Sequence, residues 1–215
     1  MTREELIKKI ALKMDEISSS DDVIVSVGTG DNNPLYAQIN GLLNESVNDV
    51  LAKAPIYRVR KHIQQCEESD AVADPKTGRI YSRITVPADF LRLVSITDDA
   101  FDRPITELAF EGDETDKRQH NKFLVAKTSK PVAVWVHHEL HKDIRCYSYG
   151  YEHEPHPVLS YVTRFGASEG LSTAIDLDEY IVDIVSWVCA GNVFLAQGAA
   201  DRAKVCNDNA AALMV

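Results

Sequence analysis

The sequence predicts an α+β protein in which a bundle of N- and C-terminal helices carries an inserted antiparallel β-sheet or sandwich region. Three observations predict this class: two early segments with helical periodicity, a run of short strand patterns separated by turns, and a long apolar helix near the end. A length of 215 residues suits a single domain. We assign residues 1–55 and 176–214 to the helical bundle and residues 56–170 to the β-rich insertion.

The two early helices have recognisable ends. Thr2 and Glu5 form a capping box, and an apolar stripe with helical spacing follows over residues 3–17. The second helix begins at Pro34, because proline suits the first helical position, and it ends before Pro55.

Between these helices an apolar run ends in Gly28-Thr-Gly30, a pattern that also occurs in phosphate-binding turns. The segment lacks the further glycines and the lysine of such loops, and Asp21, Asp22 and Asp31 surround it. We therefore predict a plain strand–turn–helix connection.

The middle of the chain is predicted to be β-rich. Asp74-Pro-Lys-Thr-Gly78 is a turn, because proline fixes φ and glycine accepts a positive φ. Residues 104–120 read as a polar segment with a short helical turn, in which the carboxylates of Glu111, Asp113, Glu114 and Asp116 are solvated. The strand patterns cover residues 57–63, 80–86, 90–96, 122–126, 131–138, 143–149 and 158–165.

Residues 184–200 form the most unusual stretch, because none of their side chains is charged. A surface helix has one apolar stripe and one polar face, whereas here apolar residues go almost all the way round. Such a helix must be buried in a core, in a membrane or between subunits. The stretch is shorter than the roughly 20 apolar residues of a membrane span, so we expect it to be the packing centre of the bundle. An aspartate in place of Trp187 or Leu195 is then expected to prevent folding. The polar residues of the stretch are Ser186, Asn192 and Gln197.

The ends of this last helix are also predicted. Asp176 and Glu179 make a second capping box for a helix that begins at Leu177. A break is expected near one of two glycines, Gly191 or Gly198. After residue 200 the pattern becomes amphipathic, with an inward face made of Ala203, Val205, Cys206 and Ala210.

The amino-acid composition disfavours some classes of function. The chain has 23 Lys and Arg residues against 33 Asp and Glu residues, a formal net charge of -10. This balance disfavours a protein that binds nucleic acid by neutralising phosphates, but it suits a channel wall past which DNA slides. The four cysteines form no C-x-x-C pair, and the N-terminus has no signal-peptide pattern, so we expect reduced thiols in a cytosolic setting.

Histidines cluster in one region, and they raise the question of a metal site. On a strand, His137, Glu139 and His141 would share a face, and two imidazoles with a carboxylate can hold a zinc ion with an open fourth position. The valines of this strand occupy the opposite face, which favours a solvated or interface role for the histidines. Trp135 shares the face of His137, and it is expected either under a helix of the same chain or in a subunit contact. No catalytic, cofactor-binding or metal-ligating residue is assigned.

One segment resembles a known family. Residues 83–96 read Arg-Ile-Thr-Val-Pro-Ala-Asp-Phe-Leu-Arg-Leu-Val-Ser-Ile. The segment is similar to a hallmark phrase of head–tail connector and neck adaptor proteins, the tail-tube-like ring proteins of short-tailed bacteriophages. The order of two early helices, a β insertion and a closing helix rich in small residues is also similar, over most of residues 1–214. Shorter phrases of the same type are Arg103-Pro-Ile-Thr-Glu107, Gln119-His-Asn-Lys-Phe123 and Ser129-Lys-Pro-Val-Ala133.

The resemblance implies a virion structural protein without enzyme activity or cofactor. It would form an oligomeric ring, commonly twelve-fold, in the phage neck or tail, as a head–tail adaptor that connects the portal to the tail and lines the DNA channel. The implied partners are further copies of the chain, the portal protein and other neck or tail ring proteins. Genomic DNA would pass without sequence-specific binding during ejection, and no membrane is involved. The implied location is the virion, after assembly in the cytoplasm of the bacterial host.

Two alternatives stay open at this point. One is a metal-dependent enzyme that uses His137, Glu139 and His141. The other is a generic bacterial scaffold or binding protein.

Overall fold

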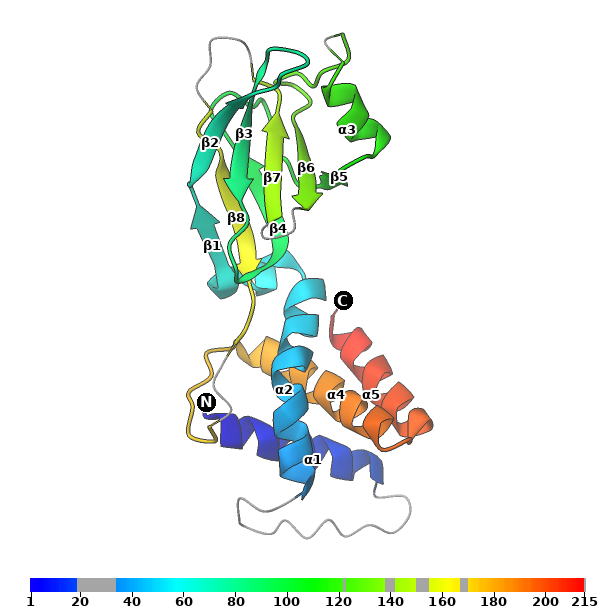
Figure 1. Ribbon diagram of the computed structural model, residues 1–215. Coiled ribbons are helices and arrows are strands. Elements are labelled where there is room, and N and C mark those ends of the chain that lie inside the picture. The colour runs from blue at the N-terminus through cyan, green and yellow to red at the C-terminus, as the bar shows by residue number, and fades with distance from the viewer. Residues whose placement is uncertain (19–33, 122, 138–141, 150–154, 167–169, 215) are drawn as a thin grey trace. The chain divides into compact units, whose positions relative to one another are not determined.

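The computed structural model describes residues 1–18, 34–121, 123–137, 142–149, 155–166 and 170–214 (Figure 1). The predicted α+β class is confirmed, with five helices and two mostly antiparallel sheets among these residues. The chain divides into two compact units. The helical unit is Met1–Arg60 with Arg164–Val215, and the β unit is Lys61–Thr163. The apolar run and the Gly28-Thr-Gly30 turn lie outside the described residues.

The first two helices begin where the sequence predicts. Helix α1 is Arg3–Ser18, and its capping box is complete. Thr2 N donates to Glu5 Oε2 at 2.8 Å, while Glu5 N donates to Thr2 Oγ1 at 3.2 Å. Helix α2 is Pro34–Lys53, with the proline at its first position.

The last helical segment is two helices, α4 (Glu179–Ala196) and α5 (Ala200–Leu213). The break falls at Gly198, whose φ of 78° lies in the left-handed region that glycine tolerates best. The second capping box is wrong, because α4 begins two residues later than predicted and Asp178 is its N-cap. The N-H of Ile175 donates to Met1 O at 2.8 Å, so the chain before α4 is held against the N-terminus instead of in a helix.

Helix α4 makes its polar bonds inside the helical unit. Ser186 Oγ donates to Val182 O at 2.7 Å, and Asn192 Nδ2 donates to Ser46 Oγ of α2 at 3.0 Å. Ser186 and Cys189 are fully buried. Among the described helices only α4 is long and apolar enough to cross a membrane, and 56% of it is buried inside the protein. Burial with internally satisfied polar groups is typical of the core helix of a bundle.

The burial of α4 is less complete than its sequence predicts. Leu195 is 54% exposed, whereas the expectation that Leu195→Asp prevents folding assumed a buried side chain at this position. Trp187 is half-buried, with Lys13 Nζ 4.8 Å from its ring centroid. Val205 of α5, predicted to face inward, is 46% exposed, whereas Ala203, Cys206 and Ala210 are buried as predicted. Helix α4 therefore has apolar residues on almost every side, but not all of these sides are buried.

A buried arginine ties α1 to α2. Arg3 is 0% exposed, and its Nη1 donates to Asn44 Oδ1 at 2.9 Å while its Nη2 donates to Asn40 O at 2.9 Å. One turn further along α2, Asn48 Oδ1 accepts a bond of 2.7 Å from Phe165 N, which fixes the segment that returns from the β unit. Buried polar groups of this kind need partners, so these amides specify the packing of the unit.

The β unit consists of two sheets. The three-stranded sheet has the order β1-β8-β4, and the five-stranded sheet has the order β2-β3-β7-β6-β5. Among the strands that the structure describes, only β5 and β6 pair in parallel. Short 3-10 helices precede the first strand at Ile56–Arg58 and Arg60–His62, and a six-residue helix, α3, spans Glu114–Gln119. The strands are β1 Ile63–Cys66, β2 Ser69–Ala73, β3 Ile80–Thr85, β4 Phe90–Thr97, β5 Leu108–Phe110, β6 Val132–His137, β7 Lys142–Tyr147 and β8 Val158–Thr163.

The two sheets pack face to face, because one buried cluster takes side chains from both. Ile84 and Ile144 come from the five-stranded sheet, and Ile96 and Leu159 come from the three-stranded sheet. Alternation along β6 follows the prediction: its valines point to the outer face of the five-stranded sheet, and Trp135 points into the interface between the sheets.

Two predicted strands are wrong. Residues 57–63 form 3-10 turns until Ile63, because the N-H of Arg58 donates to Pro55 O at 2.9 Å and so begins a tight turn. Residues 122–126 contain turns and no strand in their described part, where Leu124 N donates to Asn121 O at 2.9 Å. The predicted turn is confirmed, with Gly78 N donating to Asp74 O at 2.8 Å and a φ of 70° at Gly78.

Candidate functional site

The outer face of the five-stranded sheet carries helix α3 and the loop that follows it (Figure 1). A small buried cluster lies there, made of Val134, Val136 and Tyr147. The ring of His120, which caps α3, meets the ring of Tyr147 edge-on at 6.2 Å.

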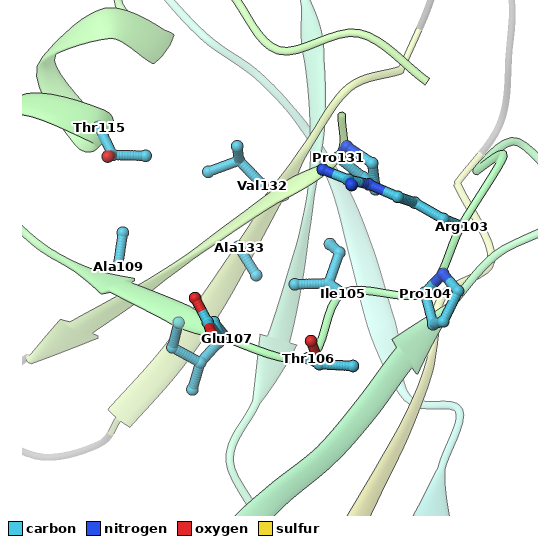
Figure 2. A pocket seen from close by; sticks show the side chains of 11 residues that line it. Arg103, Pro104, Ile105, Thr106, Glu107, Ala109, Thr115, Pro131, Val132 and Ala133 are labelled. Carbon is cyan, nitrogen blue, oxygen red and sulfur yellow. The ribbon is translucent and has the colours of Figure 1, made fainter. Parts of the chain in front are cut away.

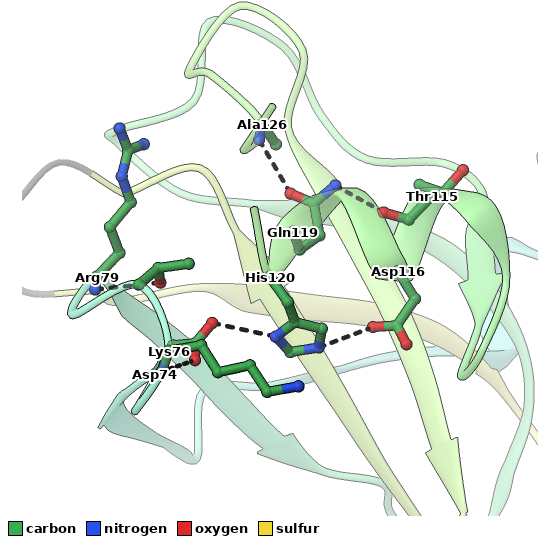
Figure 3. Close-up of polar contacts among 9 residues, drawn as sticks. Asp74, Lys76, Arg79, Thr115, Asp116, Gln119, His120 and Ala126 are labelled. Atoms are coloured by element: carbon green, nitrogen blue, oxygen red, sulfur yellow. Dashed lines mark hydrogen bonds and ion pairs between the residues drawn. The ribbon is translucent and has the colours of Figure 1, made fainter. Parts of the chain in front are cut away.

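His120 lies between two buried carboxylates (Figure 3). Its Nδ1 is 3.1 Å from Asp74 Oδ2, and its Nε2 is 3.6 Å from Asp116 Oδ1. Asp74 comes from the turn after β2, whereas Asp116 comes from α3 one helical turn before His120. The imidazole therefore fastens α3 to the β2–β3 turn.

The carboxylates are themselves fixed by backbone donors. Lys76 N donates to Asp74 Oδ1 at 2.8 Å, and Gly112 N donates to Asp116 Oδ2 at 2.9 Å. Burial alone would raise the pKa of Asp74, but hydrogen bonds from Lys76 N, His120 and Thr77 outweigh it and lower the pKa below its ordinary value. Asp74 is therefore ionised at neutral pH and stabilises the turn.

The contacts of His120 hold α3 to the turn after β2. Among the described residues, no group of three or more His, Cys, Asp and Glu side chains is placed to hold a metal ion. Burial raises the pKa of Tyr147 to about 12, so its hydroxyl is protonated at neutral pH. The role of Asp116 differs from the prediction, because this member of the expected solvated run is 6% exposed. The spacing of four residues between Asp116 and His120 was a signal for the contact.

A groove of about 610 Å³ opens beside β5 (Figure 2). The segment before β5 joins the two sheets, since Ile105 exchanges backbone hydrogen bonds of 2.8 and 2.9 Å with Ile96 of β4. Arg103 and Glu107 supply opposite charges to the groove, and Thr115 of α3 closes one side. The groove combines an apolar lining with charged side chains, as protein–protein contacts do.

Exposed apolar and basic side chains surround the end of α3. Phe123 is 83% exposed and Leu124 is 57% exposed. Residues 117–130 contain no acidic residue, in a chain with a net charge of -10. Lys117 and Leu124 line one shallow hollow together with Arg118, which is paired with Glu114. The side chains of Lys117, Phe123, Leu124, Lys127 and Lys130 are all exposed.

The residues of the zinc hypothesis are only partly described. His137 is exposed at the end of β6, and Glu139 and His141 lie outside the described residues. Trp135 on the same face is half-buried against Phe90 of β4, with a ring separation of 5.4 Å. A strand of the same chain, and not a helix, therefore provides its contact.

The phrase at residues 83–96 forms the corner where the chain passes from one sheet to the other. β3 ends at Thr85 in the five-stranded sheet, and β4 begins at Phe90 in the three-stranded sheet. Pro87 O accepts a bond of 3.0 Å from Phe90 N, which closes the turn. Asp89 Oδ1 accepts a bond of 3.1 Å from the hydroxyl of Tyr161.

The aromatic residue of the phrase is held from two sides. The ring of Phe90 lies 5.4 Å from that of Trp135 and 5.6 Å from that of Tyr161. Burial, with the carboxylate of Asp89, raises the pKa of Tyr161 to about 12, so its hydroxyl remains a donor at neutral pH. Asp89 and Phe90 of the phrase thus each have a structural reason.

No family model matches the chain, and no curated protein matches it significantly.

Proposed function

We propose that this protein is a virion structural protein that forms an oligomeric ring in the neck or tail of a short-tailed bacteriophage. It would act as a head–tail adaptor between the portal and the tail and would surround the path of the DNA. The proposal includes the twelve-fold ring, the virion location and assembly in the host cytoplasm. It includes no enzyme activity, because its role is mechanical connection.

The observation that carries the proposal is the corner at residues 86–90. Asp89 and Phe90 hold the two sheets together through Tyr161 and Trp135. The phrase similar to neck adaptor proteins therefore encodes the crossing between the sheets, which a β insertion of this architecture needs. A phrase that specifies architecture is better support for a family resemblance than one that lies in a surface loop.

The division into units also supports the proposal. The helices at the two ends of the chain form one unit, and the β unit is inserted between them. A ring subunit needs two different surfaces, because rings form by head-to-tail contacts that close. An acidic chain suits a wall that repels the phosphates of passing DNA.

The test is the protein composition of purified virions of the phage that encodes this chain. We expect the chain in virions at several copies per particle, and we expect particles without it to package DNA but to lack an attached tail. Mass spectrometry of virion proteins and infectivity after complementation measure the two outcomes. A strict monomer that is absent from virions contradicts the proposal.

A further inference from the structure

We propose that His120 is a pH-dependent fastening: helix α3 is held to the turn after β2 while the imidazole carries both of its ring protons, and it is released when the ring loses one of them. We call the side chains of His120, Asp74 and Asp116 the α3 clasp. The inference concerns the β unit alone and goes beyond the proposed function, on which it does not rest. Its basis is the hydrogen-bonding capacity of one imidazole between two buried carboxylates.

Both ring nitrogens of His120 face a carboxylate (Figure 3). Nδ1 lies 3.1 Å from Asp74 Oδ2, and Nε2 lies 3.6 Å from Asp116 Oδ1. A charged imidazole has an N–H on each side, whereas a neutral one has an N–H on one side and a lone pair on the other. An ionised carboxylate can only accept hydrogen bonds, so a neutral ring satisfies one of its two neighbours and presents a lone pair to the other.

The carboxylate of Asp116 depends on this ring. Asp116 is 6% exposed, and its Oδ2 accepts a bond of 2.9 Å from Gly112 N. Its Oδ1 is buried and has no hydrogen-bond donor among the described residues, so the imidazole of His120 is the group that faces it at 3.6 Å. A buried carboxylate oxygen that loses its compensating charge is costly. We therefore expect the loss of one ring proton to expel Asp116 from this position, and α3 with it.

Helix α3 needs an anchor of this kind. It has six residues, and isolated helices shorter than about 12 residues are marginal in water. The bond of 2.9 Å from Lys117 N to Asp113 O joins the helix only to its neighbours in the sequence. The loop after α3 depends on the helix in turn, because Gln119 Oε1 accepts a bond of 2.9 Å from Ala126 N, and Ala126 packs on the outer buried cluster. Release of α3 would therefore also loosen the cover of that cluster.

The groups that face the imidazole come from the turn, from α3 and from two strands. Tyr147 of β7 meets the ring edge-on at 6.2 Å, and burial raises its pKa to about 12, so it stays neutral. Asp74 stays ionised, because hydrogen bonds lower its pKa. Among the residue types present, histidine is the one that ordinarily changes its charge between about pH 5 and pH 8. The other ionisable groups that border the clasp are Lys76 and Arg79 of the turn, Tyr81 of β3 and Arg145 of β7.

Amide hydrogen exchange of the full chain, followed by NMR at about pH 6 and about pH 8.5, tests the clasp. The reporters are the amides of Gly112, Lys117 and Ala126, whose bonds belong to α3 and its flanks. After correction for the intrinsic exchange rate at each pH, their protection should fall at least about tenfold at the higher pH, because a hydrogen bond to a charged group is lost. Val86 N, which donates to Lys142 O at 2.9 Å, is the reference for the sheet, and its protection should not change.

An isosteric variant separates the role of the proton from that of the contact. In Asp116→Asn the amide oxygen can keep the bond from Gly112 N, and the amide nitrogen then faces His120 Nε2 as a donor. A neutral ring accepts from this group, whereas a charged ring turns its own N–H against it. The pH dependence of α3 should therefore reverse, with higher protection at about pH 8.5 than at about pH 6. His156→Gln, at an exposed histidine of the same unit, is the control and should keep the wild-type dependence.

Three results overturn the inference: reporters that are equally protected at both pH values in the wild type, an Asp116→Asn variant that opens at the higher pH as the wild type does, or a His156→Gln control that loses the dependence. Circular dichroism verifies that both variants fold. If Asp116→Asn does not fold, the NMR signals of the His120 ring in the wild type decide, because the ring and the reporters should titrate together and different midpoints contradict the clasp. None of these outcomes bears on the proposed function, which the virion measurement tests separately.

Discussion

The approach of α4 and α5 at Gly191 gives a prediction whose magnitude can be worked from the structure. A Cβ atom at Gly191 would lie 2.9 Å from Asn207 Oδ1 and 3.3 Å from Cys206 Cβ. The Asn207 side chain can rotate away, but the Cβ of Cys206 moves only with its helix. Overpacking at a helix contact costs about 1–3 kcal/mol.

Gly41 in the middle of α2 is the matched control. A Cβ atom there meets no atom within 4 Å, so Gly41→Ala should stabilise the helical unit by about 1 kcal/mol through helix propensity. Gly191→Ala gains the same propensity and also carries the packing cost. The difference in unfolding free energy between the two variants isolates that packing cost. We expect Gly191→Ala to be less stable than Gly41→Ala by about 1–3 kcal/mol.

Urea unfolding followed by circular dichroism at the helix signal measures both variants. The midpoint should rise for Gly41→Ala and should fall, or fail to rise, for Gly191→Ala. Equal stabilisation by the two substitutions would refute the close approach of α4 and α5 described above.

Two further predictions concern burial and charge. Leu195→Asp should fold with a stability within about 0.5 kcal/mol of the wild type, because the Leu195 side chain is 54% exposed. Val185→Asp, at a fully buried position of the same helix, should not fold. Soluble yield and circular dichroism distinguish the two variants, and failure of both to fold would mean that the Leu195 side chain is covered. The lowered pKa of Asp74 means that its stabilisation is present above the ordinary carboxyl value of 3.8 and is lost as the pH falls through the folded-state pKa. Asp74→Asn should therefore lose less stability than the wild type on acidification below about pH 4, and identical pH profiles would contradict the role of the carboxylate.

Local signals predicted the fold best. The capping box of α1, the proline start of α2 and the Asp74–Gly78 turn depend on neighbouring residues, and all three are present in the structure. The second capping box failed because residues 173–175 bond to the N-terminus, a partner far away in sequence. Strand β5 was missed because it has only three residues and pairs with β6 in parallel.

The candidate site was harder to predict for the same reason. The spacing of Asp116 and His120 was visible in the sequence, but Asp74 approaches from a turn more than forty residues away. The exposure of single side chains could not be predicted either. Leu195 and Val205 are apolar, but both are about half exposed in the structure. A pattern of apolar residues indicates which side chains can be buried, and the lengths and positions of the packed elements decide which ones are.

Electron microscopy of purified virions, with a label attached to this chain, tests the proposed function most directly. The account predicts label in the neck or tail, on a closed ring of copies around the DNA path. Label that is absent from the virion, or that lies on the capsid shell, would contradict it.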